Sequence, residues 1–305
     1  MQDRLWFGEL QKGWKKNQSL SFGDENMIIK VLTDNRVRKR GLLAEHGLSL
    51  YIVHRDQNVL FDVGQSNVYC HNAKKMDLDL RKTDTIVLSH GHYDHCMGLP
   101  FFPYDGKLPP IYVNRRAFQK KYASDTISPQ YRDVGITFND KEYSSISSSI
   151  VFTGEEHNVK GYESISEDIF LIGNISEITD FENESIRFYT GDDYHHDNMD
   201  DEQILIVKKQ EGLVVFTGCS HKGIVNIIEN IKLKFPEENI YAVVGGMHLE
   251  NASKTRIERT INYLMSMNLK YLIPLHCTGI KAMVQMKEYF KERCLLLCAG
   301  DSLEI

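Results

Sequence analysis

The chain has 305 residues, 42% of them hydrophobic and 26% charged, so it can bury a sizeable core as one large domain or two small ones. Its 36 Lys and Arg residues against 42 Asp and Glu residues give a formal net charge of -6, which argues against binding of nucleic acid or of an anionic membrane by bulk charge. Its apolar runs fall far short of the roughly 20 residues of a membrane-spanning helix. The six cysteines show no dense disulfide spacing and indicate reduced thiols in a cytoplasmic protein.

The segment 1–26 differs in composition from the rest of the chain. It is rich in Lys, Asn, Gln, Ser and Gly and lacks the unbroken apolar stretch of a secretory signal. We interpret it as a poorly ordered N-terminal extension, followed by one folded domain at 27–305. Residues 23–25 can be encoded by a purine-rich stretch similar to a ribosome-binding site, so we hypothesise that natural translation begins at Met27. A native mass that includes Met1 would contradict this.

From residue 27 onward, hydrophobic periodicity predicts strands that alternate with helices. The predicted strands are 27–33, 48–54, 58–62, 85–88, 110–113, 149–153, 168–173, 186–189, 203–208, 213–217, 240–244, 270–274 and 294–298. The predicted helices are 66–76, 115–122, 223–234, 254–267 and 280–291. The Ser-rich stretch 123–148 has weak periodicity and is predicted to form loops or an insertion over one face. This order predicts an α/β (α+β) fold in which helices cover sheets.

A histidine-rich loop is the strongest chemical signal in the sequence. His90, His92, Asp94 and His95 follow directly on an apolar strand. His90 and His92, at i and i+2 of an extended segment, project to one side and can bind one metal ion. A turn that begins at Asp94 lets Asp94 and His95 reach a second ion. The alternative is a solvated His-rich turn, which the buried type of strand before the loop disfavours.

Two further strand ends deliver histidines. The apolar run 214–217 leads through a turn to His221 before a helix, and the run 272–275 leads to His276 in the same way. A histidine after a strand is more often structural or solvated. Two such endings beside the His90 loop favour metal ligation, since one loop cannot supply all the ligands of a paired site.

These features together resemble the metallo-β-lactamase-fold superfamily, whose H-x-H-x-D-H signature the loop matches. Within it, the chain is similar to the group named after 7,8-dihydropterin-6-methyl-4-(β-D-ribofuranosyl)aminobenzene-5'-phosphate synthase. The segments that carry this similarity are 45–50, 60–66, 218–226, 245–249 and 274–279. The resemblance implies a four-layer αββα sandwich with a dinuclear metal site on one rim of the two facing sheets.

The sequence departs from the superfamily pattern at Cys219, where the comparable strand end usually supplies an Asp that bridges both metals. The Cys219 thiolate can act as the bridging ligand, or the residue can be inert packing; both interpretations stay open. His221 would then supply the third imidazole of the first site. The usual Gly-x-His-Thr segment is absent, and His157 is the nearest, weaker candidate for its role.

Four other positions are candidates for supporting roles. The resemblance places Asp62 beneath the metals, where it orients a ligand imidazole; the alternative is a cap of the turn that follows. His248 follows an apolar strand and two glycines, so we expect it in the substrate pocket, with a neutral structural histidine as the alternative. Lys222 and Gly223 begin a helix and can bind a substrate phosphate or carboxylate, unless Lys222 is simply solvated.

Other polar and apolar features receive structural interpretations. The run 195–197 (His-His-Asp) lies in a polar stretch and is predicted to be a flexible loop, in the manner of a lid. Cys294 and Cys298 flank three leucines and are expected to pack in the core. The helix 254–267 shows one apolar face, which predicts burial and no partner site.

The preferred function is metal-dependent hydrolysis of a small, anionic substrate, with neither nucleic acid nor a membrane as partner. The proposed ligands are His90, His92 and His221 for the first ion, and Asp94, His95 and His276 for the second. We expect two divalent ions, zinc by preference with manganese or iron as alternatives, the second ion depending on the role of Cys219. Water activated by the ions attacks a phosphoester or a carbonyl, and Asp94 orients it or receives its proton.

Three alternatives stay open. The first is a synthase in which the ions bind a diphosphate leaving group while an arylamine attacks a pterin methylene. The second is an iron protein with redox chemistry, although a diiron centre would want a carboxylate in place of His92. The third is a non-catalytic, metal-containing ligand sensor, which the complete ligand loop disfavours because a scaffold gains little from buried, unprotonated imidazoles.

Overall fold

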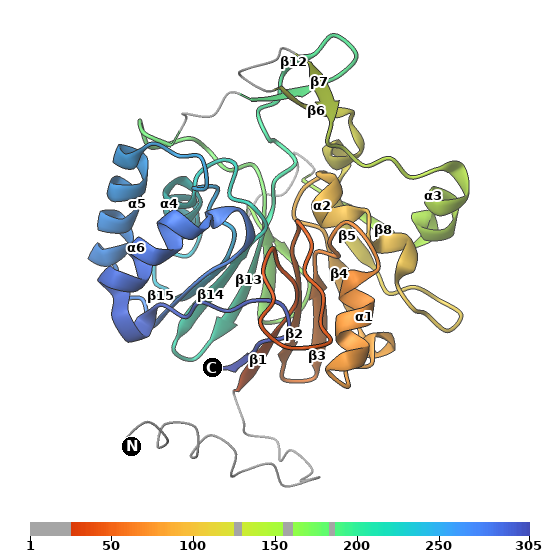
Figure 1. Cartoon of the computed structure of the whole chain (residues 1–305), viewed down its shortest axis with the longest axis horizontal. Coiled ribbons are helices and arrows are strands. Elements are labelled where there is room, and N and C mark those ends of the chain that lie inside the picture. Colours follow the sequence, from red (N-terminus) through yellow and green to blue (C-terminus); the bar gives the residue numbers. More distant parts are fainter. Residues whose placement is uncertain (1–25, 125–129, 155–160, 183–186) are drawn as a thin grey trace, which may run out of the picture.

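The structure is a computed structural model that describes residues 26–124, 130–154, 161–182 and 187–305 (Figure 1). The predicted N-terminal extension, apart from Asn26, and the candidate ligand His157 lie outside the described residues. No helix within these ranges is long and apolar enough to cross a membrane.

Two large β-sheets face each other at the centre of the fold (Figure 1). The first sheet has the order β17 (Ser302–Glu304), β1 (Met27–Thr33), β2 (Ser49–His54), β3 (Gln57–Phe61), β4 (Thr85–Val87), β5 (Ile111–Asn114) and β8 (Ile150–Thr153). The second has the order β16 (Tyr271–Pro274), β15 (Ile240–Gly245), β14 (Gly212–Thr217), β13 (Ile204–Lys209), β10 (Ile169–Ile172) and β9 (Glu163–Ser164).

Helices cover the outer faces of both sheets (Figure 1). The second sheet is covered by α4 (Ile224–Lys234), α5 (Lys254–Ser266) and α6 (Ile280–Phe290), and the other α-helices are α1 (Val68–Lys75), α2 (Tyr93–Cys96) and α3 (Asp140–Ile146). Short 3-10 helices lie at Leu80–Lys82, Leu99–Phe101, Arg115–Phe118, Ser147–Ser149, His276–Thr278 and Lys291–Arg293. The layers therefore follow the predicted αββα order.

The central strands are apolar on both sides because each sheet contacts the opposite sheet on one face and helices on the other. In β14, Val214 and Phe216 belong to the core between the sheets, whereas Leu213 and Val215 pack beneath the helices. Tyr51 of β2 likewise turns to the outer side of the first sheet. Strands buried on both faces have near-continuous apolar sequences, which is why these strands were recognisable from the sequence.

A third, four-stranded antiparallel sheet projects beyond one end of the sandwich, at the top of Figure 1. Its order is β12 (His195–His196), β11 (Phe188–Thr190), β6 (Lys121–Ser124) and β7 (Tyr131–Asp133). We call it the small sheet. The predicted loop at 195–197 is wrong for His195 and His196, since both pair with β11 as a short, exposed strand.

The predicted helix 115–122 is also wrong, since the segment is a single 3-10 turn followed by β6. For 123–148, loops alone are wrong because the described part contains β7 and α3, while an insertion over one face stays a prediction. Strand β6 is too short to show alternation, and its partner β11 lies far along the sequence. Helix α3 has a capping box between Asn139 and Glu142, a local signal that the Ser-rich composition obscured.

The C-terminal strand lies later than predicted. Within 294–298, Cys294 makes only an isolated bridge with Leu272, and the final strand is β17, which pairs with β1. A turn intervenes, since the Leu297 amide donates to the Leu295 carbonyl. Cys294 and Cys298 are buried, as expected.

Candidate metal centre

The candidate ligands come from loops at one rim of the two large sheets. His90 and His92 follow β4, His221 follows β14, and His276 follows β16. His92 has an extended backbone and is the N-cap of helix α2. Asp94 and His95 therefore lie in the single turn of α2. Parallel strands place their carboxyl ends at a common edge, which explains how segments far apart in sequence meet here.

Four residues at this rim have a left-handed backbone conformation. The φ angles are 56° at Asp62, 61° at Ser220, 49° at His248 and 46° at His276. Non-glycine residues pay for this left-handed conformation, and such residues cluster where the surrounding structure must aim a side chain.

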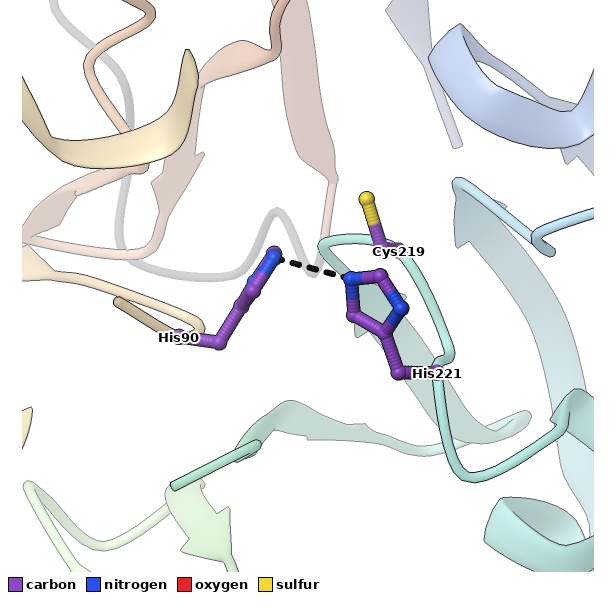
Figure 2. Close-up of side chains that lie close together, drawn as sticks. All are labelled: His90, Cys219 and His221. Atoms are coloured by element: carbon purple, nitrogen blue, oxygen red, sulfur yellow. Dashed lines mark hydrogen bonds between the residues drawn. The ribbon is translucent and has the colours of Figure 1, made fainter. Parts of the chain in front are cut away.

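The first ligand group consists of three imidazoles and one thiol. His90 Nε2 lies 3.1 Å from His92 Nδ1 and 3.2 Å from His221 Nε2. His90 and His221 also form a compact group with Cys219, in which the candidate ligand atoms lie within 4.8 Å of one another (Figure 2). Burial, together with neighbouring imidazoles, lowers the pKa of His90, His92 and His221 well below the usual value, so all three are neutral and able to bind a metal.

The second group lies on the other side of Cys219. His95, Cys219 and His276 form a compact group with the same 4.8 Å limit, and His95 Nε2 is 3.2 Å from Cys219 Sγ. Asp94 Oδ2 lies 3.3 Å from His276 Nε2 and 3.7 Å from His95 Nε2. Cys219 therefore belongs to both groups.

Asp62 organises the ligands from below. It is fully buried and accepts hydrogen bonds from His95 Nδ1 at 2.7 Å, Ser89 Oγ at 2.8 Å and the Ser89 amide at 2.7 Å. Because the Ser89 hydroxyl donates to Asp62, it can accept from His90 Nδ1, 2.9 Å away. These hydrogen bonds occupy Nδ1 of His90 and His95 and leave their Nε2 atoms facing the candidate metal positions, as carboxylate–histidine pairs do in metal sites.

The donor set fits divalent transition metal ions. His90 Nε2 lies within 3.2 Å of an imidazole nitrogen of His92 and of His221, and the buried Nε2 of His92 has no hydrogen-bond partner among the described residues. Burial lowers the pKa of His95, but the carboxylates of Asp94 and Asp62 outweigh this effect and raise it to about 9. A metal ion at His95 Nε2 would thus take the place of a proton that the site already favours. Imidazole, thiolate and carboxylate together suit zinc, manganese or iron.

The structure adds residues that the sequence analysis missed. His46 Nε2 lies 3.2 Å from Asp94 Oδ2, and Asn35 Oδ1 accepts from His276 Nδ1 at 2.7 Å. His46 lies in a loop before β2 and does not directly follow a strand. The search for histidines just after strands therefore did not identify it, although it lies in one of the segments shared with the family. Cys277 groups with Cys219 and His248.

Glu202 was also missed. Its buried carboxylate accepts from the backbone amides of His221 at 2.7 Å and Lys222 at 3.0 Å, which fixes the loop that carries the ligand. Burial raises the pKa of Glu202 to about 7, because the two amides only partly offset the loss of solvation. An acidic residue in a polar stretch gives no sequence signal for such a role.

The start of α4, predicted to bind a substrate phosphate, is surrounded by carboxylates of the protein itself. Lys222 Nζ lies 3.3 Å from Asp200 and 3.8 Å from Glu177, and Glu182 accepts from the amides of Val225 and Asn226. Neither Lys222 nor Gly223 lines the large cavity described below. The structure thus brings every proposed metal ligand together, and His248 with them, but not these two residues.

A cavity of about 1040 Å³ opens over the ligand groups. Its floor includes Cys219, His221 and His276, and His248 lines it as predicted. The small sheet forms part of the opposite wall through Arg132 and Phe188. The Phe188 ring lies 4.9 Å from the ring of His92 and 5.0 Å from that of His221, measured between centroids.

The fold and this rim define a metallo-β-lactamase-type protein. The family model of the metallo-beta-lactamase superfamily matches residues 43–200. The chain belongs to this superfamily.

Particular relatives narrow the group. An uncharacterized protein of Methanocaldococcus jannaschii is 31% identical over 262 residues, which span 86% of this chain and 94% of the relative. The 7,8-dihydropterin-6-methyl-4-(beta-D-ribofuranosyl)-aminobenzene-5'-phosphate synthase of the same organism is 31% identical over 275 residues, spanning 86% of this chain and 90% of the synthase. The crystal structure of Tm1679, described as a metal-dependent hydrolase of the beta-lactamase superfamily, has 31% identity and a TM-score of 0.75, and covers 92% of this chain and 99% of its own.

Proposed function

We propose that this protein is a metal-dependent hydrolase that acts on a small anionic molecule at the rim of the two large sheets. The observation that carries this proposal is the position of Cys219, whose sulfur belongs to two adjacent histidine-rich groups beneath an open cavity. His90, His92 and His221 would hold one ion, and Asp94, His95 and His276 the other, with Cys219 between them. Two zinc ions held in this way would supply Lewis acidity and would lower the pKa of water.

Asp94 is the proposed proton acceptor. Burial raises the pKa of its carboxyl, but His95, His276 and His46 outweigh this and hold the pKa well below its usual range. Asp94 is therefore a carboxylate at neutral pH. It lines the cavity beside His46, so one of its oxygens can orient a water molecule toward the substrate and take up its proton.

The cavity walls supply positioning and partial exclusion of water. Phe188 covers His92 and His221 from above, and its ring also lies 5.9 Å from that of His248. His248 lines the cavity, and its buried Nδ1 has no hydrogen-bond partner among the described residues, so its imidazole can hydrogen-bond a leaving group or a carbonyl. This arrangement requires no serine or cysteine nucleophile.

The similarity to Tm1679, described as a metal-dependent hydrolase, supports this proposal. The test is a screen of phosphodiesters, phosphomonoesters and lactones with the zinc-loaded or manganese-loaded protein, before and after treatment with a chelator. We expect turnover of one substrate class that is lost on chelation and restored by metal. Stoichiometric metal binding with no turnover of any member would favour a ligand sensor and contradict the hydrolase proposal.

A synthase is the second candidate, because a similarly close relative bears the name of a dihydropterin synthase. In this version, metal ions held by the same residues would bind a diphosphate leaving group while an arylamine attacks a pterin methylene. The volume of the cavity is compatible with two substrates at once. Incubation with a pterin methyl diphosphate and an arylamine distinguishes the two: a coupled product together with released diphosphate supports the synthase, and release of diphosphate without coupling supports the hydrolase.

The cytoplasmic location and the small-molecule partner remain parts of the proposal. All six cysteines lie within the described ranges, and the structure shows each of them as a free thiol. Free thiols in this number are typical of a reducing compartment. Fractionation of the host cell with an antibody to the chain tests the location.

A further inference from the structure

A third group of candidate metal ligands lies in the cavity beside the two that the proposed function uses. Cys219, His248 and Cys277 all line the cavity, and their candidate ligand atoms lie within 4.8 Å of one another. The two thiols are buried and the imidazole is half-buried. The third group therefore combines two sulfur atoms with one nitrogen atom, whereas each of the other two groups contains a single sulfur atom.

Neighbouring residues of one turn serve different groups. His276 and Cys277 belong to the same 3-10 helix, and His276 has a φ of 46°. His276 Nε2 lies 3.3 Å from Asp94 Oδ2, whereas the Cys277 sulfur lies 3.4 Å from the Cys219 carbonyl oxygen. The turn thus directs the two side chains to different places, and Cys277 is available to a separate group.

The absence of a side chain at Gly246 makes room for the Cys277 sulfur. A Cβ atom at residue 246 would lie 2.6 Å from Cys277 Sγ and 2.4 Å from the Gly218 carbonyl oxygen, which is closer than such atoms pack. The Gly246 amide also donates to this carbonyl at 3.1 Å. The loop after β15 therefore packs closely against the loop after β14 where Cys277 approaches Cys219.

Hydrogen bonds also join the loop after β15 to the loop after β16. The amides of Leu249 and Glu250 both donate to the Cys277 carbonyl at 3.2 Å. His248 precedes these two residues with a φ of 49°, and its buried Nδ1 has no hydrogen-bond partner within the described ranges. The fold thus holds the three side chains of the third group together through backbone contacts, as a preorganised site requires.

We infer that Cys219, Cys277 and His248 form a separate site for a soft, thiophilic metal ion, with one coordination position open to the cavity. Thiolates select soft ions such as cadmium, copper(I) and zinc, whereas carboxylate oxygens suit manganese. Two cysteines and one histidine with an open fourth position are a known ligand set of zinc sites that bind water or substrate. Because the site shares Cys219, an ion bound here would draw that thiolate away from the two histidine-rich groups. The inference goes beyond the proposed function, since it concerns which ion binds where and requires no turnover.

Cadmium is the probe, titrated into the metal-free full chain while the ultraviolet absorption of cadmium–thiolate bonds is followed. The parent protein should show the absorption of two thiolates and Cys277→Ser that of one, so the absorption at saturation should fall by about half. The cadmium affinity of this variant should also fall by more than about 100-fold, because a direct ligand is lost. His248→Ala should lose affinity but keep the full absorption at saturation, since its nitrogen makes no bond between cadmium and sulfur.

Cys298→Ser is the matched control. Cys298 is buried, and its sulfur lies 3.4 Å from an oxygen of Asp301, the same distance that separates the Cys277 sulfur from the Cys219 carbonyl oxygen, but it does not line the cavity. It should bind cadmium like the parent protein. Manganese provides the comparison with a harder ion, and Cys277→Ser should leave manganese binding unchanged.

An unchanged absorption of cadmium-saturated Cys277→Ser would overturn the inference, because it would show that Cys277 makes no bond to the ion. Equal losses of cadmium and manganese affinity in this variant would also overturn it, since they would indicate a general effect on the cavity. Failure of the hydrolase proposal would appear separately, as missing turnover in the substrate screen, while the cadmium titration would still report on the two thiols.

Discussion

The metal-site rim and the small sheet are built on different principles although they face the same cavity. At the rim, the ligand side chains are buried apart from the half-buried His221, and Asp62 is fixed by three hydrogen bonds. The small sheet projects from the sandwich and leaves Tyr131 and Tyr194 well exposed. The geometry of the ligands thus depends on a packed core that tolerates little change. The cavity wall formed by the small sheet lies on an element whose outer side chains are free to vary.

One buried lysine joins the two regions. Lys121 of the small sheet lies 2.7 Å from Asp197 and 2.9 Å from Asp201, and Asp201 in turn accepts from the Gly91 amide in the ligand loop at 2.7 Å. Burial lowers the pKa of Lys121, but the two carboxylates outweigh this and raise it. The lysine is therefore charged, and its loss would leave two buried carboxylates facing each other.

The largest effect should come from breaking this link. Lys121→Met is expected to lower the free energy of unfolding by about 3–5 kcal/mol, the usual cost of leaving a buried charge without its partner. Urea denaturation measures it. Lys120→Met is the matched control, because Lys120 and its partner Asp192 are both well exposed, and it should change stability by less than about 0.5 kcal/mol. Equal effects of the two substitutions would show that the small sheet does not depend on the buried pair.

Removal of a ligand should affect metal content next most strongly. His92→Ala is expected to weaken binding of the first ion by more than about 100-fold, since even loss of a residue that only orients a ligand costs 10–100-fold. Elemental analysis of protein purified without added metal should give about two zinc or manganese equivalents for the parent and fewer for the variant.

The control for this experiment is His195→Ala, an exposed histidine of the small sheet that pairs with Asp193. It should keep the metal content of the parent. About one equivalent in the parent, or mostly iron, would mean that Cys219 does not bridge two ions and would direct attention to the synthase or redox alternatives.

Loss of the Asp62 carboxylate, which orients the ligands, should reduce metal affinity less than loss of a ligand. Asp62→Asn preserves shape but removes the charge that orients His95, so zinc affinity should fall about 10–100-fold. A competition assay with a chromophoric chelator measures this change. Asp84→Asn alters a carboxylate that accepts from Asn58, outside the cavity, and should leave zinc affinity unchanged. An unaltered affinity in Asp62→Asn would refute the orienting role.

The smallest effect is expected on the outer face of the small sheet. Tyr131 stacks on Tyr194 with ring centroids 4.2 Å apart, so Tyr131→Ala should cost about 0.5–1.5 kcal/mol of stability and leave metal content intact. Tyr104→Ala is the control, since Tyr104 has the same 44% exposure as Tyr131 and no ring contact within the described residues. A loss of metal in Tyr131→Ala would contradict the independence of the two regions.

Much of the fold was predictable because its central strands and helices have strong local patterns. The strands of both large sheets, apart from β9 and β17, and helices α1, α4, α5 and α6 lie close to the predicted ranges. The errors fall where local patterns are weak: β6, β7 and β12 are short and pair with distant segments, and β17 follows a turn that the leucines of 295–297 concealed.

The candidate site divides in the same way. His90, His92, Asp94 and His95 were identifiable from one loop because their spacing alone brings them together. His221 and His276 required the additional argument that strand ends share a rim. His46, Asn35 and Glu202 gave no such signal, since their contacts with the ligands arise only when separate loops pack together.

The sequence by itself identified the metal-binding loop and the superfamily, because both depend on residue types at short, fixed spacings, and the layer order followed from the resemblance to that superfamily. Only the tertiary structure decided that Cys219 belongs to both ligand groups, that the helix start at Lys222 is occupied by the protein's own carboxylates, and that Arg132 faces the cavity. These facts depend on how distant segments meet in space, and the free energy that brings them together comes from the packing of the whole core.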